Sequence, residues 1–191
     1  MSIVITAANG RLGQAVAAEF QRRGAIGAIR LAARNPGKLS GLKAQGFAIG
    51  RADYDSASSM EAAFAGVETL LLISSYGGTS EDRIRQHANA IEAARKAGIR
   101  HIAYTSFANP TAASKFLNVA PHIETEKLLR ESGMQYTIFR NNLYVANIVG
   151  DLRKADESGV LAMPGAHGKA AYISHEDLAG SRPPEWCRSC G

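Results

Sequence analysis

A short turn near the start of the chain has the residue types that bind phosphate groups. The turn Ala7–Gly13 lies between an apolar segment, Ser2–Thr6, and a segment of helical character, Gln14–Arg23. Where a strand passes through such a turn into a helix, free backbone N–H groups and the positive end of the helix dipole favour a bound phosphate. The spacing predicts a pyrophosphate site, in which Gly10 and Gly13 allow close approach of the backbone and close packing of the helix.

The turn departs from the usual glycine pattern at its first position, where Ala7 stands in place of a glycine. A left-handed backbone at an alanine would cost about 1–2 kcal/mol, which a folded domain can tolerate. A plain strand–turn–helix connection without a ligand is the alternative for this segment. The residues predicted here to contact a dinucleotide are Thr6, Ala7, Asn9, Gly10, Arg11, Leu12 and Gly13.

The next strand-like segment, Ala28–Ala33, ends in a basic residue where NAD-binding sites usually place Asp or Glu. No carboxylate lies between Glu19 and Asp53. Arg34 follows the segment directly, and its guanidinium would match the 2′-phosphate of NADP in charge and in hydrogen-bonding geometry. The sequence therefore predicts NADP(H) rather than NAD(H) as cofactor, and an exposed loop arginine is the alternative.

Strand and helix patterns alternate along the chain and must position these residues. The expected strands are Ser2–Thr6, Ala28–Ala33, 46–53, 67–73, 99–105 and 135–140, and the expected helices are 14–23, 56–65, 80–97 (capped by Ser80), 121–132 and one that starts near Ser174. This order predicts an α/β fold with a doubly wound parallel sheet and right-handed crossovers. Ligands of such sheets bind at the carboxyl ends of the strands, which adds Asp53, Ser74, Ser75 and the segments 105–107 and 140–147 to the candidates. For Asp53, contact with the adenine amino group and a role as a turn former are both open.

Composition limits the classes of function. The chain has 191 residues, 46% hydrophobic and 20% charged, with a formal net charge of +5. Its basic residues are scattered, which gives weak support for nucleic acid as a partner, and no apolar run is long enough to span a membrane. With no apparent signal peptide, we expect a cytoplasmic protein without a nucleic-acid or membrane partner.

Several motifs together resemble one known family. They are the glycine turn, 34–36, 52–54, 70–75, 102–106, 122–127 (His-x-x-x-Glu-Lys) and 140–141. Over roughly residues 2–178 the chain resembles the NmrA-like atypical short-chain dehydrogenase/reductases, and within them the NADPH:quinone oxidoreductase type 2 subgroup. The combination of the strand and the His-x-x-x-Glu-Lys motif is more specific than the glycine turn alone.

The resemblance implies a cofactor, a reaction and further site residues. NADPH would be bound by the glycine turn, Arg34 and the segment 141–146, with Asn141, Asn142, Leu143 and Tyr144 as contacts and Lys169 as a further cofactor-side residue. The implied reaction is direct hydride transfer to a small quinone-like substrate, without flavin or metal. In that subgroup an asparagine on the helix after the sixth strand lies beside the nicotinamide, and Asn147 is the matching position here. A homodimer is an open alternative to a monomer.

The chain lacks the Tyr-x-x-x-Lys pair of ordinary short-chain dehydrogenases, and this absence bears on the mechanism. A quinone can take its proton from water, so a site that positions the reactants, with Asn147 donating to the developing oxyanion, would be sufficient. His122 is either a proton donor or a structural residue. We expect Tyr104 in the core, and Glu126 and Lys127 on a solvated helix face. An NADP-sensing regulator without catalysis and a reductase or isomerase for another small molecule are the alternative functions.

The last twelve residues differ in character from the rest of the chain. We predict an NAD(P)-binding domain at 1–179 and an unstructured tail at 180–191, where Pro183 stops the preceding helix. Cys187 and Cys190 lie alone in this tail and make a poor metal site, because zinc needs four ligands. Members of the family are longer, so the substrate-side part of the fold is expected to be incomplete, through premature termination or in a natural short form.

Overall fold

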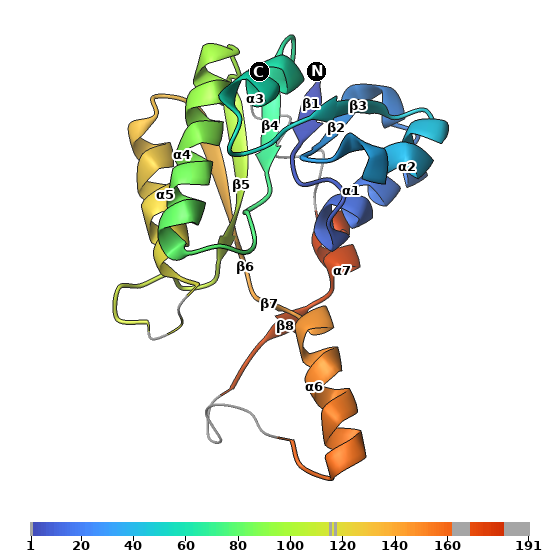
Figure 1. Ribbon diagram of the computed structural model, residues 1–191, viewed down its shortest axis with the longest axis vertical. Helices are drawn as coiled ribbons and strands as arrows, with labels where there is room; N and C mark the ends of the chain where they lie inside the picture. The colour runs from blue at the N-terminus through green and yellow to red at the C-terminus, as the bar shows by residue number, and fades with distance from the viewer. Residues whose placement is uncertain (1, 115, 117, 162–168, 182–191) are drawn as a thin grey trace.

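Parallel strands form the central sheet of the computed structural model, which describes residues 2–114, 116, 118–161 and 169–181. In spatial order the sheet runs β3-β2-β1-β4-β5-β6, so successive strands are added on one side of β1 up to β3 and on its other side from β4 onward (Figure 1). The strands are β1 (Ile3–Ile5), β2 (Ile29–Ala33), β3 (Ala48–Arg51), β4 (Thr69–Leu72), β5 (His101–Phe107) and β6 (Gln135–Asn141). The predicted doubly wound parallel sheet is confirmed.

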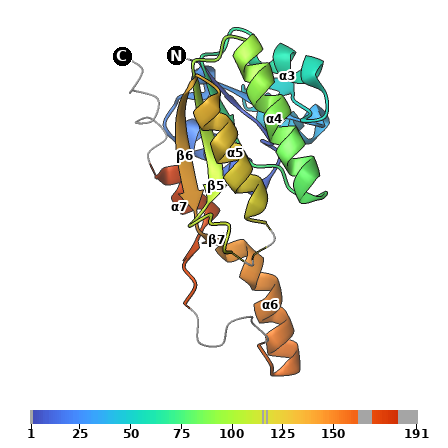
Figure 2. The ribbon, with the colours of Figure 1, turned by 90° about the vertical axis from the view of Figure 1, so that its left-hand side faces the viewer.

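Helices cover both faces of this sheet (Figures 1 and 2). On one face lie α1 (Arg11–Arg22) and α7 (His175–Gly180), and on the other lie α3 (Ala57–Phe64), α4 (Ser80–Lys96) and α5 (Ala120–Glu131). A short α2 (Ser40–Ala44) and two 3-10 turns, η1 (Ile26–Ala28) and η2 (Pro36–Leu39), flank β2 and β3. Alternate residues of β1 enter the two hydrophobic clusters, with Ile5 in one and Val4 in the other. Burial of both faces explains why the central strands are almost continuously apolar.

A small arm extends from the sheet edge where β6 ends (Figures 1 and 2). It contains β7 (Leu143–Tyr144), which pairs in parallel with β8 (Tyr172–Ile173), and α6 (Val145–Ser158). The sequence patterns did not predict this strand pair, because two residues are too few to show a period. The helix after β6 was expected only from the family resemblance.

Two predicted helix starts require correction. The cap of α4 is Thr79 and not Ser80: the Thr79 hydroxyl accepts from the Asp82 amide (3.1 Å), and the Asp82 carboxylate accepts from the Thr79 amide (3.0 Å). This reciprocal capping box satisfies two amides that Ser80 could not satisfy together. Helix α1 begins at Arg11, three residues before the predicted start. The predicted tail lies outside the described residues from position 182 onward, including Pro183, Cys187 and Cys190.

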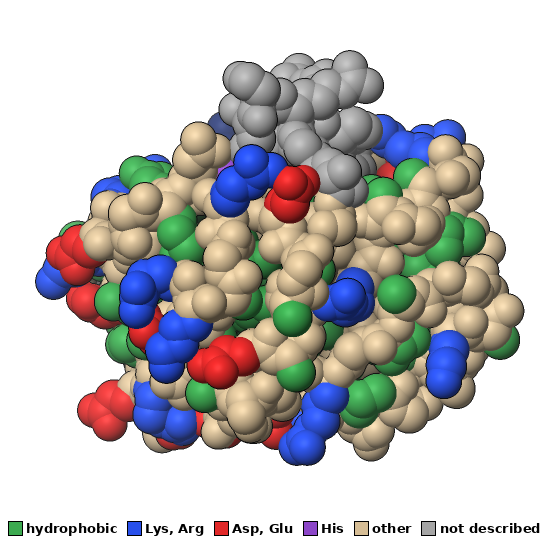
Figure 3. Space-filling model, turned by 90° about the horizontal axis from the view of Figure 1, so that it is seen from above, with side chains coloured by type: hydrophobic (Ala, Val, Ile, Leu, Met, Phe, Trp, Pro, Cys, Tyr) green, Lys and Arg blue, Asp and Glu red, His purple; other side chains and the backbone are tan. Residues whose placement is uncertain are grey.

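On the face seen from above in Figure 3, Lys and Arg side chains are interspersed with Asp and Glu. Within the described residues, no helix is long and apolar enough to cross a membrane.

The glycine turn has the backbone conformation that its sequence suggested. Ala7 has a φ of 49°, in the left-handed region, and its carbonyl accepts from the Gly10 amide at 2.9 Å. A Cβ atom at Gly13 would lie 2.5 Å from the Ala8 Cα, so only glycine lets α1 approach the end of β1 this closely. Two separate constraints, one on φ and one on space, shape this turn.

The left-handed backbone at Ala7 predicts that Ala7→Gly stabilises the protein. Removal of the Cβ relieves about 1–2 kcal/mol of strain, whereas the greater freedom of glycine in the unfolded state costs about 1 kcal/mol, for a net gain of up to about 1 kcal/mol. Urea unfolding of the cofactor-free protein measures the change. As a control, Ala18→Gly on the exposed face of α1 should lower stability by about 1 kcal/mol. A loss of stability in both variants would contradict the strain at position 7.

Candidate functional site

A cavity of about 760 Å³ opens at the carboxyl ends of the strands, across the point where the sheet order reverses between β1 and β4. It is lined by these predicted site residues: Ala7, Asn9, Gly10, Arg11, Leu12, Gly13, Arg34, Asp53, Ser74, Ser75, Asn141, Asn142, Leu143, Tyr144 and Asn147. Thr6 and Lys169 are not among the lining residues. The fold therefore brings together residues that lie far apart in the sequence, from Ala7 to His175.

Free amides at the start of α1 face this cavity. Gly10 occupies the N-cap position and offers no side chain to cap the helix. In the part of the chain that the structure describes, the amides of Arg11, Leu12 and Gly13 have no backbone or side-chain acceptor. Such amides at the positive end of a helix dipole suit a pyrophosphate.

Cationic side chains gather beside the turn. Arg34 follows β2, Lys38 lies on η2 and Arg11 begins α1, and all three are exposed residues of the cavity wall. Among the described residues, none of the three has a carboxylate within ion-pair distance. The Asn35 side chain accepts from the Gly37 amide at 3.1 Å and fixes the turn between Arg34 and Lys38. This corner fits a phosphate monoester such as the 2′-phosphate of NADP.

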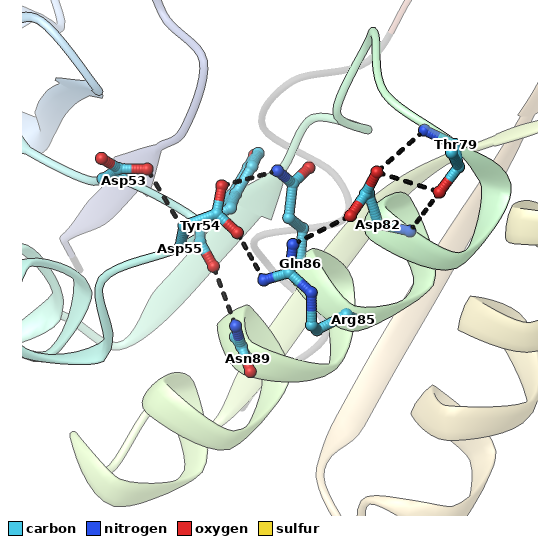
Figure 4. A network of polar contacts seen from close by, with 8 residues as sticks. All are labelled: Asp53, Tyr54, Asp55, Thr79, Asp82, Arg85, Gln86 and Asn89. Atoms are coloured by element: carbon cyan, nitrogen blue, oxygen red, sulfur yellow. Dashed lines mark hydrogen bonds and ion pairs between the residues drawn. The ribbon is translucent and has the colours of Figure 1, made fainter.

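The loop after β3 forms a further wall and is held against α4 (Figure 4). The Asp55 carboxylate accepts from the Gln86 amide group at 2.8 Å and from the Arg85 guanidinium, and Asn89 donates to the Tyr54 carbonyl at 3.0 Å. Asp53 accepts from the Asp55 amide at 3.2 Å, which is the turn-forming role that the sequence left open. Because Asp53 also lines the cavity, the contact with adenine stays a prediction.

Thr6 and Tyr54 form a buried support beneath the cavity. The Tyr54 hydroxyl lies 2.7 Å from Thr6 Oγ1 and 2.6 Å from the Ile73 carbonyl oxygen. Thr6 Oγ1 also accepts from the Ile73 amide (3.2 Å) and donates to the Leu71 carbonyl (3.1 Å). Thr6 therefore connects the ends of β1 and β4, and its hydrogen bond with Tyr54 fixes the loop that follows β3.

A buried histidine supports the turn after β4. The Ser75 amide donates to His87 Nε2 at 2.9 Å, so Nδ1 must carry the proton, which it donates to Thr125 Oγ1 at 2.7 Å. Burial first, and then the positive charge of Arg83 and the nearby His122, lower the pKa of His87 to about 3. His87 is thus neutral at physiological pH and fixes the position of Ser75.

Arg83 and His122 lie together on the other side of the cavity. Arg83 donates from Nη2 to Ser74 Oγ (3.0 Å) and from Nη1 to Asn118 Oδ1 (3.2 Å), and Nη2 lies 3.5 Å from His122 Nε2. His122 Nδ1 is 2.8 Å from the hydroxyl of the fully buried Tyr104. Burial and the Arg83 charge lower the pKa of His122 to about 4. A neutral imidazole at pH 7 favours the structural alternative for His122, and Tyr104 lies in the core as expected.

The prediction of a solvated Glu126 is wrong. This carboxylate is buried, accepts from Ser106 Oγ at 2.7 Å, and forms ion pairs with Arg130 (2.8 Å) and Arg140 (2.7 Å). Burial alone would raise the pKa of Glu126, but the hydrogen bonds from Arg140, Ser106 and Arg130 outweigh it and lower the pKa. The burial of Glu126 depends on a contact between separate elements, because Arg140, near the end of β6, forms its ion pair with this carboxylate. Lys127 is exposed, as expected.

The segment after β6 forms the remaining wall. Asn141 donates to the Tyr144 hydroxyl at 3.2 Å, and the Tyr144 ring lies 4.4 Å from the His175 ring. Asn147 is an exposed residue of α6 that lines the same cavity. Lys169 is exposed and lies outside the cavity lining, so its contact with a cofactor stays a prediction.

Sequence reasoning missed several cavity residues, namely Tyr54, Asp55, Arg83, Gln86, Phe116, Asn118 and His175. For Arg83 a signal was available: with His87, Ala90, Ile91 and Ala94 it falls on the helical period of the buried face of α4. Phe116 stacks on Phe107 with ring centroids 5.2 Å apart, and no local pattern indicates that contact.

Comparison with known proteins assigns the family. A family model described as NAD(P)H-binding matches residues 7–180. The chain belongs to this family. It is 40% identical over 178 residues to quinone oxidoreductase 2 of Escherichia coli K12, covering 93% of this chain and 61% of that protein. It is 32% identical over 183 residues to the NmrA-like family domain-containing oxidoreductase flvB of Aspergillus flavus, covering 94% of this chain and 59% of that protein.

Solved structures agree with the assignment. The triphenylmethane reductase of Citrobacter sp. complexed with NADP(H) superposes with a TM-score of 0.87 at 36% identity, over 94% of this chain and 63% of that chain. The NADPH-dependent quinone oxidoreductase QOR2 of Escherichia coli complexed with NADPH gives a TM-score of 0.86 at 39% identity, over 93% of this chain and 62% of that chain. The chain thus spans about three fifths of the length of these relatives.

The buried neutral histidines predict that acid destabilises the protein. Unfolded histidine binds a proton below about pH 6.5, whereas folded His87 and His122 resist protonation down to about 3 and about 4. The unfolded state therefore binds more protons, and the free energy of unfolding falls as the pH drops from about 6.5 to about 4, by about 1.4 kcal/mol per pH unit for each histidine. Urea unfolding across this range measures the slope. His87→Gln should lower the slope of the unfolding free energy against pH by the contribution of one proton. Equal slopes for variant and parent would contradict the assignment of a neutral, buried His87.

Proposed function

We propose that this chain is the cofactor-binding domain of an NADPH-dependent reductase that transfers hydride to a quinone or a similar conjugated acceptor. The observation that carries the proposal is one continuous cavity with free helix amides after β1, unpaired cations after β2 and an aromatic wall after β5. The identity to quinone oxidoreductase 2 supports the same reaction class.

The residues present fit NADPH. The amides of Arg11, Leu12 and Gly13 would hold the pyrophosphate, and Arg34 with Lys38 would hold the 2′-phosphate. The loop after β3 would lie beside the adenine. The segment 141–146 and Asn147 would lie on the nicotinamide side. Bound in this way, the cofactor supplies two electrons and a hydrogen as hydride.

The chain's own residues suit an acceptor that needs no strong acid. His122 is neutral at pH 7 and is bonded to Tyr104, so it holds no proton of suitable acidity for an alkoxide. A quinone becomes aromatic on accepting hydride and takes its proton from water. Asn147 borders the cavity and would donate a hydrogen bond to the oxygen that becomes negative.

Arg34→Gln tests the cofactor preference. Loss of a charge-assisted bond to the 2′-phosphate should weaken NADPH binding by about tenfold or more, equivalent to about 1.5–3 kcal/mol, and leave NADH binding unchanged. Isothermal titration of parent and variant with both cofactors measures the difference. Lys43→Gln removes a charge from the exposed α2 outside the cavity and serves as control. Equal affinity of the parent for NADPH and NADH would contradict the role of Arg34.

Asn147→Ala tests the nicotinamide side. If Asn147 stabilises charge that develops during hydride transfer, the variant should lose about tenfold or more in kcat with little change in NADPH affinity. Stopped-flow NADPH oxidation with a panel of benzoquinones and naphthoquinones measures turnover. Asp151→Ala, one turn later on α6 and outside the cavity, is the matched control. Unchanged turnover removes Asn147 from the mechanism, and NADPH binding by the parent without turnover on any acceptor would point to a cofactor-sensing regulator.

A further inference from the structure

Arg83 lies in the wall of the cavity and is a buried cation that has no carboxylate partner among the described residues. It is 6% exposed and lies in the first turn of α4. Its guanidinium contacts the three neutral groups already described, on Ser74, Asn118 and His122. Its Nε atom is enclosed and has no hydrogen-bond partner in the described part of the chain. A buried guanidinium is unfavourable unless an anion or an electron-rich oxygen completes its surroundings.

In the part of the chain that the structure describes, no neighbouring group neutralises this charge. The buried carboxylate of Glu126 is directed to Arg130, Arg140 and Ser106. The adjacent histidine, His122, is neutral at physiological pH and contributes no negative charge. Arginine itself keeps its proton in proteins. The wall of the cavity therefore carries a full positive charge at this point.

The position of Arg83 separates it from the expected phosphate contacts. The free amides follow β1 and Arg34 follows β2, whereas Arg83 bonds to Ser74, after β4, and contacts His122 on α5. In the sheet order β3-β2-β1-β4-β5-β6, these contacts lie on opposite sides of the β1–β4 boundary. The phosphates of a dinucleotide bound along this edge would occupy the β1–β3 half. These phosphates would not neutralise Arg83, so its charge is available to a different ligand bound in the β4–β6 half.

Aromatic rings border the cavity on the same side. The Phe107 ring stacks on Phe116 (5.2 Å, 23° between planes) and on His122 (6.1 Å, 24°). Tyr76, which is 98% exposed, follows Ser75 on the same rim. Flat, nearly parallel rings favour a planar unsaturated ligand. The ligand that fits this half of the cavity is planar and carries an electron-rich oxygen.

We propose that Arg83 binds the oxygen of a planar acceptor and stabilises the negative charge that hydride transfer places on it. This inference rests on the proposed function and assigns the acceptor-binding group of the same site. The acceptor gains two electrons and one hydrogen from NADPH, which becomes NADP⁺. The acceptor oxygen then carries the negative charge. It takes a proton from water, and this completes the hydroquinone. The terminal amino groups of Arg83, which already reach Ser74 and Asn118 at the cavity wall, would make the contact.

A redox-inert probe tests the inference without turnover. 4-Nitrophenol is planar, and its phenolate oxygen resembles the charged oxygen of a half-reduced quinone. With the parent protein saturated with NADP⁺, we expect binding of the yellow phenolate in preference to the neutral phenol, seen as an increased phenolate absorbance at a fixed pH near neutrality. Arg83→Met should weaken phenolate binding at least tenfold, Arg83→Lys should retain part of it, and the control Arg95→Gln, at the exposed end of α4, should bind like the parent.

A comparison on the parent alone keeps the inference testable if Arg83→Met does not fold. Nitrobenzene has the same ring and nitro group but no phenolate oxygen, so it should bind at least tenfold more weakly than 4-nitrophenolate. Equal affinity for the two probes would overturn the role of Arg83.

Kinetics separate this inference from the proposed function. If both hold, Arg83→Met lowers kcat/KM for quinones at least tenfold and leaves the Kd for NADPH unchanged. If Arg83→Met binds 4-nitrophenolate and reduces quinones like the parent, the inference fails and the proposed function stands. If the parent reduces no acceptor but binds 4-nitrophenolate through Arg83, the anion site stands and the proposed reductase activity fails.

Discussion

The close contact between Gly13 and the backbone of Ala8 is the constraint on which the site depends. With only hydrogen at this position, α1 packs directly on the end of β1, and its first turn opens into the cavity. A methyl group there would push the helix away from the strand, because the nearest atoms belong to backbone and cannot move aside. The strain at Ala7 belongs to the same turn, since its left-handed φ brings its carbonyl to the Gly10 amide. Packing and ligand geometry are therefore set by the same few atoms.

The two halves of the sheet hold their positive charge in different ways. On the β1–β3 side, Arg11, Arg34 and Lys38 are exposed to solvent, which suits a hydrated phosphate. On the β4–β6 side, Arg83 is buried and held by neutral groups, so its field acts in a medium of lower dielectric constant. A fixed, desolvated cation contributes more to a charge that appears during reaction than a solvated one does. The division follows from the sheet order and, under the proposed function, would separate binding of the cofactor from recognition of the acceptor.

Much of this architecture could be predicted from sequence because the signals are local. The apolar runs that form β1, β2 and β4, the glycine turn and Arg34 could each be recognised within a few residues, and the alternation of strands and helices indicated a doubly wound parallel sheet, whose strand order the structure then supplied. Glu126 could not be placed correctly, because its burial depends on Arg140, which reaches it from another element. The pair β7–β8 is too short to show a period, and the Phe107–Phe116 contact joins a strand to a loop. Contacts between separate elements, more than the elements themselves, were missing from the prediction.

The network around His122 explains why this histidine does not act as an acid in the site. Arg83 lies next to the imidazole, and its charge together with burial keeps the ring neutral. A protonated His122 beside Arg83 would place two positive charges in one buried wall, which the surrounding neutral groups could not compensate. The same cation that would favour a negative oxygen on the proposed acceptor therefore prevents its neighbour from acting as a proton donor. Acceptors that are stabilised on gaining hydride, and that take their proton from water, are the ones this charge arrangement would select.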